Sequence, residues 1–153
     1  LMPKASVKQL IECKKKDLID LVLDIEKYPE FVPFCFDAKI YENKNEGDLK
    51  KIIADLTIGK GPFKDTYKSD VVYNRKEDSI FVKNIDGPLN HLSNNWNFVD
   101  KENGTTEITF DIDFEIKNKF LNSLMVVSFQ FGLEKIADAF QKRAKDLFGN
   151  PKN

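Results

Sequence analysis

Few residues of this chain are suited to acid–base or metal chemistry, and those few lack the usual partners. His91 is the single histidine, and no GxSxG, CxxC or HExxH motif surrounds it. A catalytic imidazole needs a positioned partner, so a surface or hydrogen-bonded structural role is the better interpretation. Cys13 and Cys35 fit neither a disulfide scaffold nor a zinc site and are expected to be free thiols. We predict no catalytic residue, no metal site and no enzymatic activity.

Two further patterns are better explained by structure than by chemistry. The acids Glu107, Asp111, Asp113 and Glu115 alternate with Ile and Phe, which places them on the solvated face of one strand. Residues 59–62 read Gly-Lys-Gly-Pro, which lacks the GxxxxGK spacing of a phosphate-binding loop and indicates a turn.

Composition narrows the class of protein. The 153 residues are 41% hydrophobic and 32% charged, with a net charge of −1, which excludes a disordered chain and gives no global attraction to DNA. No apolar run approaches the roughly 18–20 residues of a membrane span, and residues 1–4 show no secretory or transit signal. We expect one domain over 1–153, located in a bacterial cytoplasm or at the periphery of the inner membrane, or else inside an organelle.

The periodicity of apolar residues predicts the elements that position any site. A short strand over 5–13 is followed by a helix over 16–25 and by a helical turn over 28–36 that two prolines keep short. From 37 to 117 the period is two, and close turn signals indicate an antiparallel meander. Residues 119–148 return to helical spacing. The fold class is α+β, with the long C-terminal helix laid across the dry face of the sheet.

Bulky aromatic residues are numerous for a sheet covered by one helix, and two interpretations remain open. They fill a solid core, or they line a hollow one shaped for an apolar ligand. Ser69 beside Tyr67, and Asn94 beside Trp96, stand at inward positions and favour the hollow core slightly.

The start of the last helix is also unusual. Residues 120–131 contain no charge, and Leu124, Val127 and Phe131 point away from the stripe that faces the sheet. This surface is either buried under the segment 28–36 or in contact with a second molecule, such as a membrane.

Four stretches together resemble a known family: residues 24–35 (DIEKYPEFVPFC), 87–92 (GPLNHL) followed by 96–98 (WNF), 113–115 (DFE) and 139–144 (AFQKRA). They are similar to the coenzyme Q-binding protein family of the START-like (polyketide cyclase/lipid transport) superfamily, over about 3–149.

This resemblance implies a helix-grip fold: a curved antiparallel sheet of about seven strands, two short helices after the first strand, and a lipid-sized cavity under the C-terminal helix. Mitochondrial members bind ubiquinone as a ligand rather than a cofactor, and support respiration and quinone synthesis without known catalysis. Bacterial members are labelled ribosome-association toxins, which bind the large ribosomal subunit and block subunit joining. A polyketide aromatase/cyclase is a third alternative.

By analogy, we expect a hydrophobic small molecule, a quinone or similar polyprenyl lipid, to contact the cavity residues. These are Phe31, Phe34, Phe36, Leu56, Tyr67, Trp96, Phe110, Phe114, Met125 and Phe129. Leu124, Val127 and Phe131 are the expected membrane or partner contacts. The acids of 107–115 argue against rRNA as the main partner, although the lysines of 14–16 leave a basic patch open.

Overall fold

The computed structural model describes residues 4–149, apart from the side chains at positions 127 and 128. Its elements, in chain order, are β1 (Lys4–Ile11), α1 (Lys15–Leu23), the 3-10 helix η1 (Ile25–Glu30), β2 (Cys35–Glu46), β3 (Leu49–Lys60), β4 (Phe63–Asn74), β5 (Ser79–Asp86), β6 (Leu89–Asp100), the short 3-10 helix η2 (Glu102–Gly104), β7 (Thr106–Ile116) and α2 (Lys119–Phe148).

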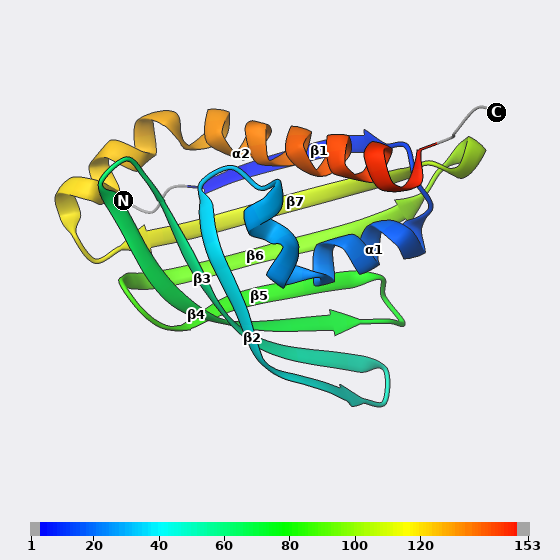
Figure 1. The fold of residues 1–153 in the computed structure, drawn as a ribbon, viewed down its shortest axis with the longest axis horizontal. Coiled ribbons are helices and arrows are strands. Elements are labelled where there is room, and N and C mark those ends of the chain that lie inside the picture. Colours follow the sequence, from blue (N-terminus) through cyan, green and yellow to red (C-terminus); the bar gives the residue numbers. More distant parts are fainter. Residues whose placement is uncertain (1–3, 150–153) are drawn as a thin grey trace.

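The seven strands form one antiparallel sheet in the order β1-β7-β6-β5-β4-β3-β2. Strands β2 to β7 therefore form a meander. Strand β1 pairs with β7 and forms one edge of the sheet, and β2 forms the other edge. Figure 1 shows α2 running along the β1 side of the sheet, with α1 and η1 beside it on the same face. This arrangement of sheet and helices confirms the expected α+β helix-grip architecture, including the two short helices that follow the first strand. The lipid-sized cavity under the C-terminal helix stays a prediction.

Alternation along the strands decides which side chains face the helices. In β7, Ile108, Phe110 and Phe114 are buried, while Asp111 between them is exposed. We call the face that carries the buried residues the inner face of the sheet and the opposite face the outer face.

The long helix α2 has three different sides. Leu133, Ala137, Phe140 and Ala144, at spacings of four, three and four residues, are buried against the sheet and α1. Phe120, Leu124 and Phe131 lie on the opposite side and are 67, 49 and 63% exposed. Between residues 4 and 149, no helix is long and apolar enough to cross a membrane.

The apolar interior is divided into two clusters. The larger one joins α1 and the C-terminal half of α2 to the sheet, with Leu18, Ile108 and Phe140 at or below 1% exposure. The smaller one contains Leu89, Leu92 and Phe114, with half-buried neighbours such as Tyr67 and Phe129. Only the larger cluster is tightly closed, so the two ends of the inner face differ in character.

Candidate ligand-binding site

The segment after α1 separates the closed end of the inner face of the sheet from the less covered end. Tyr28 and Phe31 each meet Phe140 of α2 edge-to-face, with ring centroids 5.5 and 5.1 Å apart. Glu30 accepts a hydrogen bond of 2.9 Å from the Arg143 guanidinium. These contacts hold the segment 28–34 against α2.

Phe34 extends this boundary toward the start of α2. Its backbone adopts φ +71°, which is unusual for a residue with a side chain. A Cβ atom at Gly132 would lie 3.8 Å from the Phe34 ring, so this ring reaches α2 where the helix has no side chain. Met125 is seven residues before Gly132 on the same side of α2, yet it is 39% exposed. One side of the uncharged helix start thus faces the loop, and the opposite side remains exposed.

Two of the expected cavity residues belong to the packed end. Trp96 and Phe110 are each 6% exposed and stack with centroids 4.2 Å apart. Phe140 also meets Trp96 edge-to-face, with ring centroids 5.3 Å apart. Both rings are therefore enclosed by protein side chains, as is most of Phe31, and whether any of the three touches a ligand stays a prediction.

The other end of the inner face carries apolar side chains that the helices do not cover. Leu56 and Tyr67 are register partners on β3 and β4 and are half-buried. Phe129 of α2 is also half-buried, and its ring lies 4.5 Å from that of Phe114. We define the inner apolar patch as Phe34, Leu56, Ile58, Tyr67, Met125 and Phe129. Ile58, which pairs with Cys35, is 37% exposed and was absent from the prediction.

Phe36 was expected among these residues but lies elsewhere. The register between β2 and β3 shifts between Cys35 and Asp37, so Phe36 is the extra residue of a β-bulge. Its ring is 47% exposed and lies under the Lys64 ammonium, 4.0 Å from ring centroid to nitrogen. Because a bulge interrupts the alternation, the pattern of the sequence did not reveal this position.

Three polar groups lie within or beside the inner apolar patch: the hydroxyls of Tyr28 and Tyr67 and the thiol of Cys35. The Tyr28 hydroxyl donates to the Val22 carbonyl, and the Cys35 thiol lies 3.6 Å from the Asp37 carbonyl. The Tyr67 hydroxyl has no hydrogen-bond partner among the residues of 4–149 that the structure describes. Burial raises the pKa of both tyrosines, and that of Cys35 to about 11, so all three are neutral at physiological pH.

The inward polar residues that the sequence singled out are satisfied within the protein. Ser69 is fully buried, and its hydroxyl donates to the Ala54 carbonyl at 3.2 Å. Asn94 accepts a hydrogen bond of 3.2 Å from the Trp96 indole. Neither residue therefore indicates a bound ligand.

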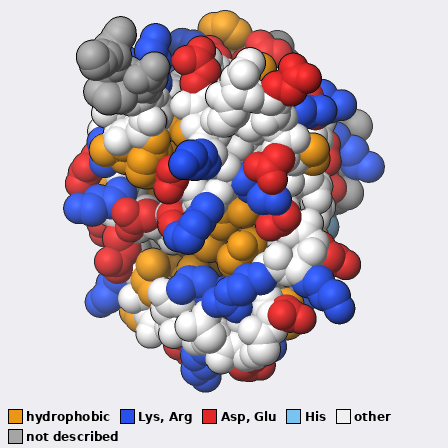
Figure 2. Space-filling model, turned by 90° about the vertical axis from the view of Figure 1, so that its right-hand side faces the viewer, with side chains coloured by type: hydrophobic (Ala, Val, Ile, Leu, Met, Phe, Trp, Pro, Cys, Tyr) orange, Lys and Arg blue, Asp and Glu red, His pale blue; other side chains and the backbone are white. Residues whose placement is uncertain are grey.

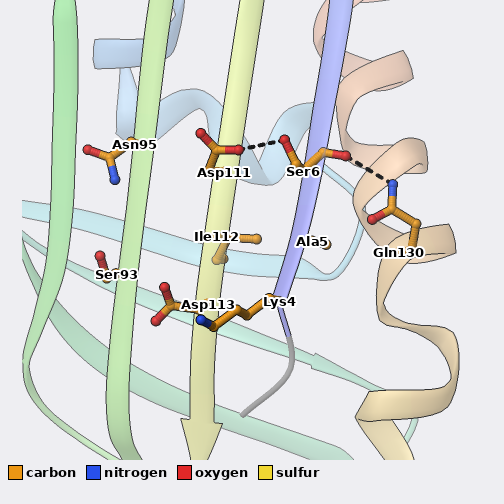
Figure 3. Close-up of a pocket in the computed structure, with 9 residues that line it drawn as sticks. All are labelled: Lys4, Ala5, Ser6, Ser93, Asn95, Asp111, Ile112, Asp113 and Gln130. Atoms are coloured by element: carbon orange, nitrogen blue, oxygen red, sulfur yellow. Dashed lines mark hydrogen bonds between the residues drawn. The ribbon is translucent and has the colours of Figure 1, made fainter.

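A polar hollow of about 480 Å³ lies on the outer face beside β1, β7 and β6. Figure 3 shows Ser6 donating to Asp111 and Gln130 of α2 donating to the Ser6 carbonyl. Asp113 is paired with His91, which is consistent with a structural role for this histidine. Several of its polar groups are thus already hydrogen bonded, and Lys4, Asp111 and Asp113 place charges along its lining, so it does not suit a wholly apolar ligand.

Comparison with known proteins places this geometry in a family. Residues 12–141 match the family described as polyketide cyclase / dehydrase and lipid transport. The chain belongs to this family.

Two curated relatives differ in what their names describe. The ribosome association toxin RatA of Rickettsia prowazekii is 32% identical over 142 residues, which cover 91% of this chain and 94% of the relative. The mitochondrial coenzyme Q-binding protein COQ10 of Dictyostelium discoideum is 32% identical over 134 residues, covering 85% of this chain and 63% of the relative. Membership of the polyketide cyclase and lipid transport family therefore leaves more than one function open.

A solved structure supports the fold. The START superfamily protein from Mycobacterium smegmatis superimposes with a TM-score of 0.80, at 20% identity, over 94% of this chain and 98% of that one. The resemblance identified from the sequence, to START-like coenzyme Q-binding proteins, is confirmed at the level of family and fold.

The GPLNHL motif has a structural role that spacing alone did not reveal. Gly87 adopts φ +132°, and a Cβ atom there would lie 2.8 Å from both Cα and Cβ of Tyr67. Only glycine fits so close to the β4 backbone. The motif was recognised in the sequence, but its contact with Tyr67 depends on the pairing of strands.

Proposed function

We propose that the chain binds ubiquinone or a similar polyprenyl lipid at the inner apolar patch. It acts as a carrier that supports respiratory electron transport and quinone synthesis, and it does not catalyse a reaction on its ligand. The observation that carries this proposal is the uncovered end of the inner face, where Ile58 and Met125 remain 37 and 39% exposed beside a closed core. The name of the COQ10 relative, at 32% identity, supports the choice of a quinone.

Apolar burial supplies the energy in this proposal. A polyprenyl tail that covers these side chains gains about 25 cal/mol for each Å² of apolar surface removed from water. Such binding needs few directional groups, which agrees with a patch made almost wholly of aliphatic and aromatic side chains. The paired acid–base groups, His91 and Asp113, lie at the outer face and are not positioned to act on this ligand.

The test is a titration with a short-chain ubiquinone, followed by native mass spectrometry of the wild type and of matched charge variants. Phe129→Asp places a carboxylate in the inner apolar patch and should abolish binding, because an unpaired charge would be buried under the ligand. Phe131→Asp, two residues further on the exposed side of α2, should bind normally. Met125→Asp provides a second inner variant at a more exposed position in case Phe129→Asp does not fold. Equal binding by folded inner and outer variants would contradict the proposal.

We further propose that the exposed side of α2 meets a membrane from which the lipid is collected. Phe120, Leu124 and Phe131 form an apolar stripe, and Lys119 is the single charged residue between 119 and 133. Lys135 lies 4.8 Å from the centroid of the Phe131 ring. An apolar stripe with lysines at both ends suits the interface of a bilayer that contains anionic lipids. The Val127 side chain, an expected contact, lies outside the described residues.

Ribosome association is the second candidate, because the relative named RatA covers nearly the whole chain at 32% identity. The charge distribution gives it less support. Lys15 is paired with Asp78 at 2.8 Å and with Asp100 at 3.0 Å, and Lys16 with Asp20 at 3.0 Å. Figure 2 shows lysines and acids interspersed over this end of the molecule. Binding to purified large subunits that falls steeply with salt would favour this candidate.

A further inference from the structure

We infer that the Tyr67 hydroxyl donates a hydrogen bond to a carbonyl oxygen at the polar end of the bound lipid, and that Gly87 holds this hydroxyl in place. The inference rests on the proposed function and adds how the site distinguishes a quinone from a plain hydrocarbon of similar length.

Tyr67 lies beside the smaller apolar cluster. Its side chain packs against the cluster of Leu89, Leu92 and Phe114, near the uncovered end of the inner face. The hydroxyl is not sealed inside the protein: within residues 4–149, Arg143 Nε is the only enclosed side-chain polar atom without a partner, so the Tyr67 hydroxyl is open to solvent. A ligand that covers it would displace that water, and the donor would then need an acceptor on the ligand. Among the described residues, no acceptor is bonded to the Tyr67 hydroxyl. A carbonyl group on a ligand would supply one.

The polar groups nearest to Tyr67 already have hydrogen-bond partners within the protein. The Tyr28 hydroxyl already donates a hydrogen bond to the Val22 carbonyl, and the Cys35 thiol donates to the Asp37 carbonyl. Burial raises the pKa of Tyr67, and the adjacent Cys35 raises it further, so the phenol keeps its proton at physiological pH. Tyr67 therefore offers a neutral donor to the inner apolar patch, which suits an uncharged carbonyl better than a carboxylate or phosphate.

The turn between β5 and β6 approaches the backbone of Tyr67 closely. Gly87 lies against the Tyr67 backbone so tightly that any side chain would displace it. Asp86, just before it, pairs with Lys68, and the register shifts between Lys68 and Ser69. The turn and this bulge together fix where the Tyr67 side chain leaves β4.

The experiment compares two ligands on two tyrosine variants. Short-chain ubiquinone has ring carbonyls, and squalene is an isoprenoid hydrocarbon without any. Tyr67→Phe removes only the hydroxyl and should weaken ubiquinone binding about 3- to 10-fold while leaving squalene binding unchanged. Tyr73→Phe is the matched control, because Tyr73 is also half-buried on β4 but packs against the larger cluster. It should change neither affinity.

The possible results separate this inference from the proposed function. If wild-type protein binds ubiquinone and Tyr67→Phe binds it equally well, or weakens both ligands alike, the hydroxyl has no part in recognition and the inference is overturned. If the wild type binds neither ligand, the proposed function itself fails, and the inference fails with it.

Discussion

At the scale of single residues, Gly87 and Gly47 both adopt positive φ, +132° and +60°, but only Gly87 is crowded. No atom lies within 4 Å of a Cβ built at Gly47. We expect Gly47→Ala to lower the free energy of unfolding by about 1 kcal/mol, and Gly87→Ala by about 3 kcal/mol or more, because its side chain must also push β4 aside. Urea denaturation measures both. Similar losses at the two positions would contradict the close approach to Tyr67.

The two thiols give a pH-dependent prediction. Burial raises the pKa of both Cys13 and Cys35 to about 11, so the reactive thiolate is scarce at pH 8 and increases as the pH rises toward that value. We expect both cysteines of the folded protein to react slowly with Ellman's reagent at pH 8, and quickly once the chain is unfolded in guanidinium.

The rate for the folded protein should increase with pH up to about pH 11, if the fold persists. Cys13→Ser and Cys35→Ser variants assign the signal to one thiol or the other. A fast reaction of either thiol in the folded protein at pH 8 would show that its surroundings are more open than the structure indicates.

At the scale of elements, the two sides of α2 differ in their expected response to charge. Replacing both Leu124 and Phe131 by Lys should reduce association with vesicles of anionic lipids several-fold, because apolar contact is lost. The two changes also add positive charge, so a purely electrostatic attraction would instead become stronger. Sedimentation with vesicles measures the association, and circular dichroism checks the fold.

A matched control for this experiment is Asp138→Lys, on the exposed side of the C-terminal half of α2. It changes charge by the same amount without removing apolar surface, and it should not weaken association. Unchanged binding by the Leu124/Phe131 double variant would exclude the membrane-contact surface.

The elements themselves could be predicted from the sequence because their signals are local. The strict alternation around Phe110 and Phe114 decides the inner face of β7, and helical spacing predicted the bounds of α2. What the sequence did not reveal depends on pairing between distant segments. The bulge at Phe36 and the contact of Gly87 with Tyr67 arise only when neighbouring strands come into register.

The candidate site was predicted in part for the same reason. Leu56, Tyr67 and Phe129 stand at inward positions in both the sequence pattern and the structure. The pattern gave Trp96 and Phe110 the same inward direction, but it carries no information on packing density. Their stacking with Phe140 appears only when α2 is laid on the sheet.

At the scale of the whole molecule, the interior is divided between a part that stabilises the fold and a part that we propose binds a ligand. The closed cluster around Phe140 joins α1, α2 and the sheet and contains most of the buried apolar residues. The end near Tyr67 and Met125 is left less covered, and this is the end that the account assigns to the lipid. Stability and binding are thus placed at opposite ends of the same inner face.

The most direct test of this assignment is native mass spectrometry, with organic extraction, of the protein purified from a host that makes polyprenyl quinones. We expect a quinone to copurify with the wild type at near-stoichiometric amounts. The Phe129→Asp variant should lose this quinone, and the Phe131→Asp variant should retain it. A wild-type protein that carries no lipid, and takes up no added quinone, would contradict this assignment.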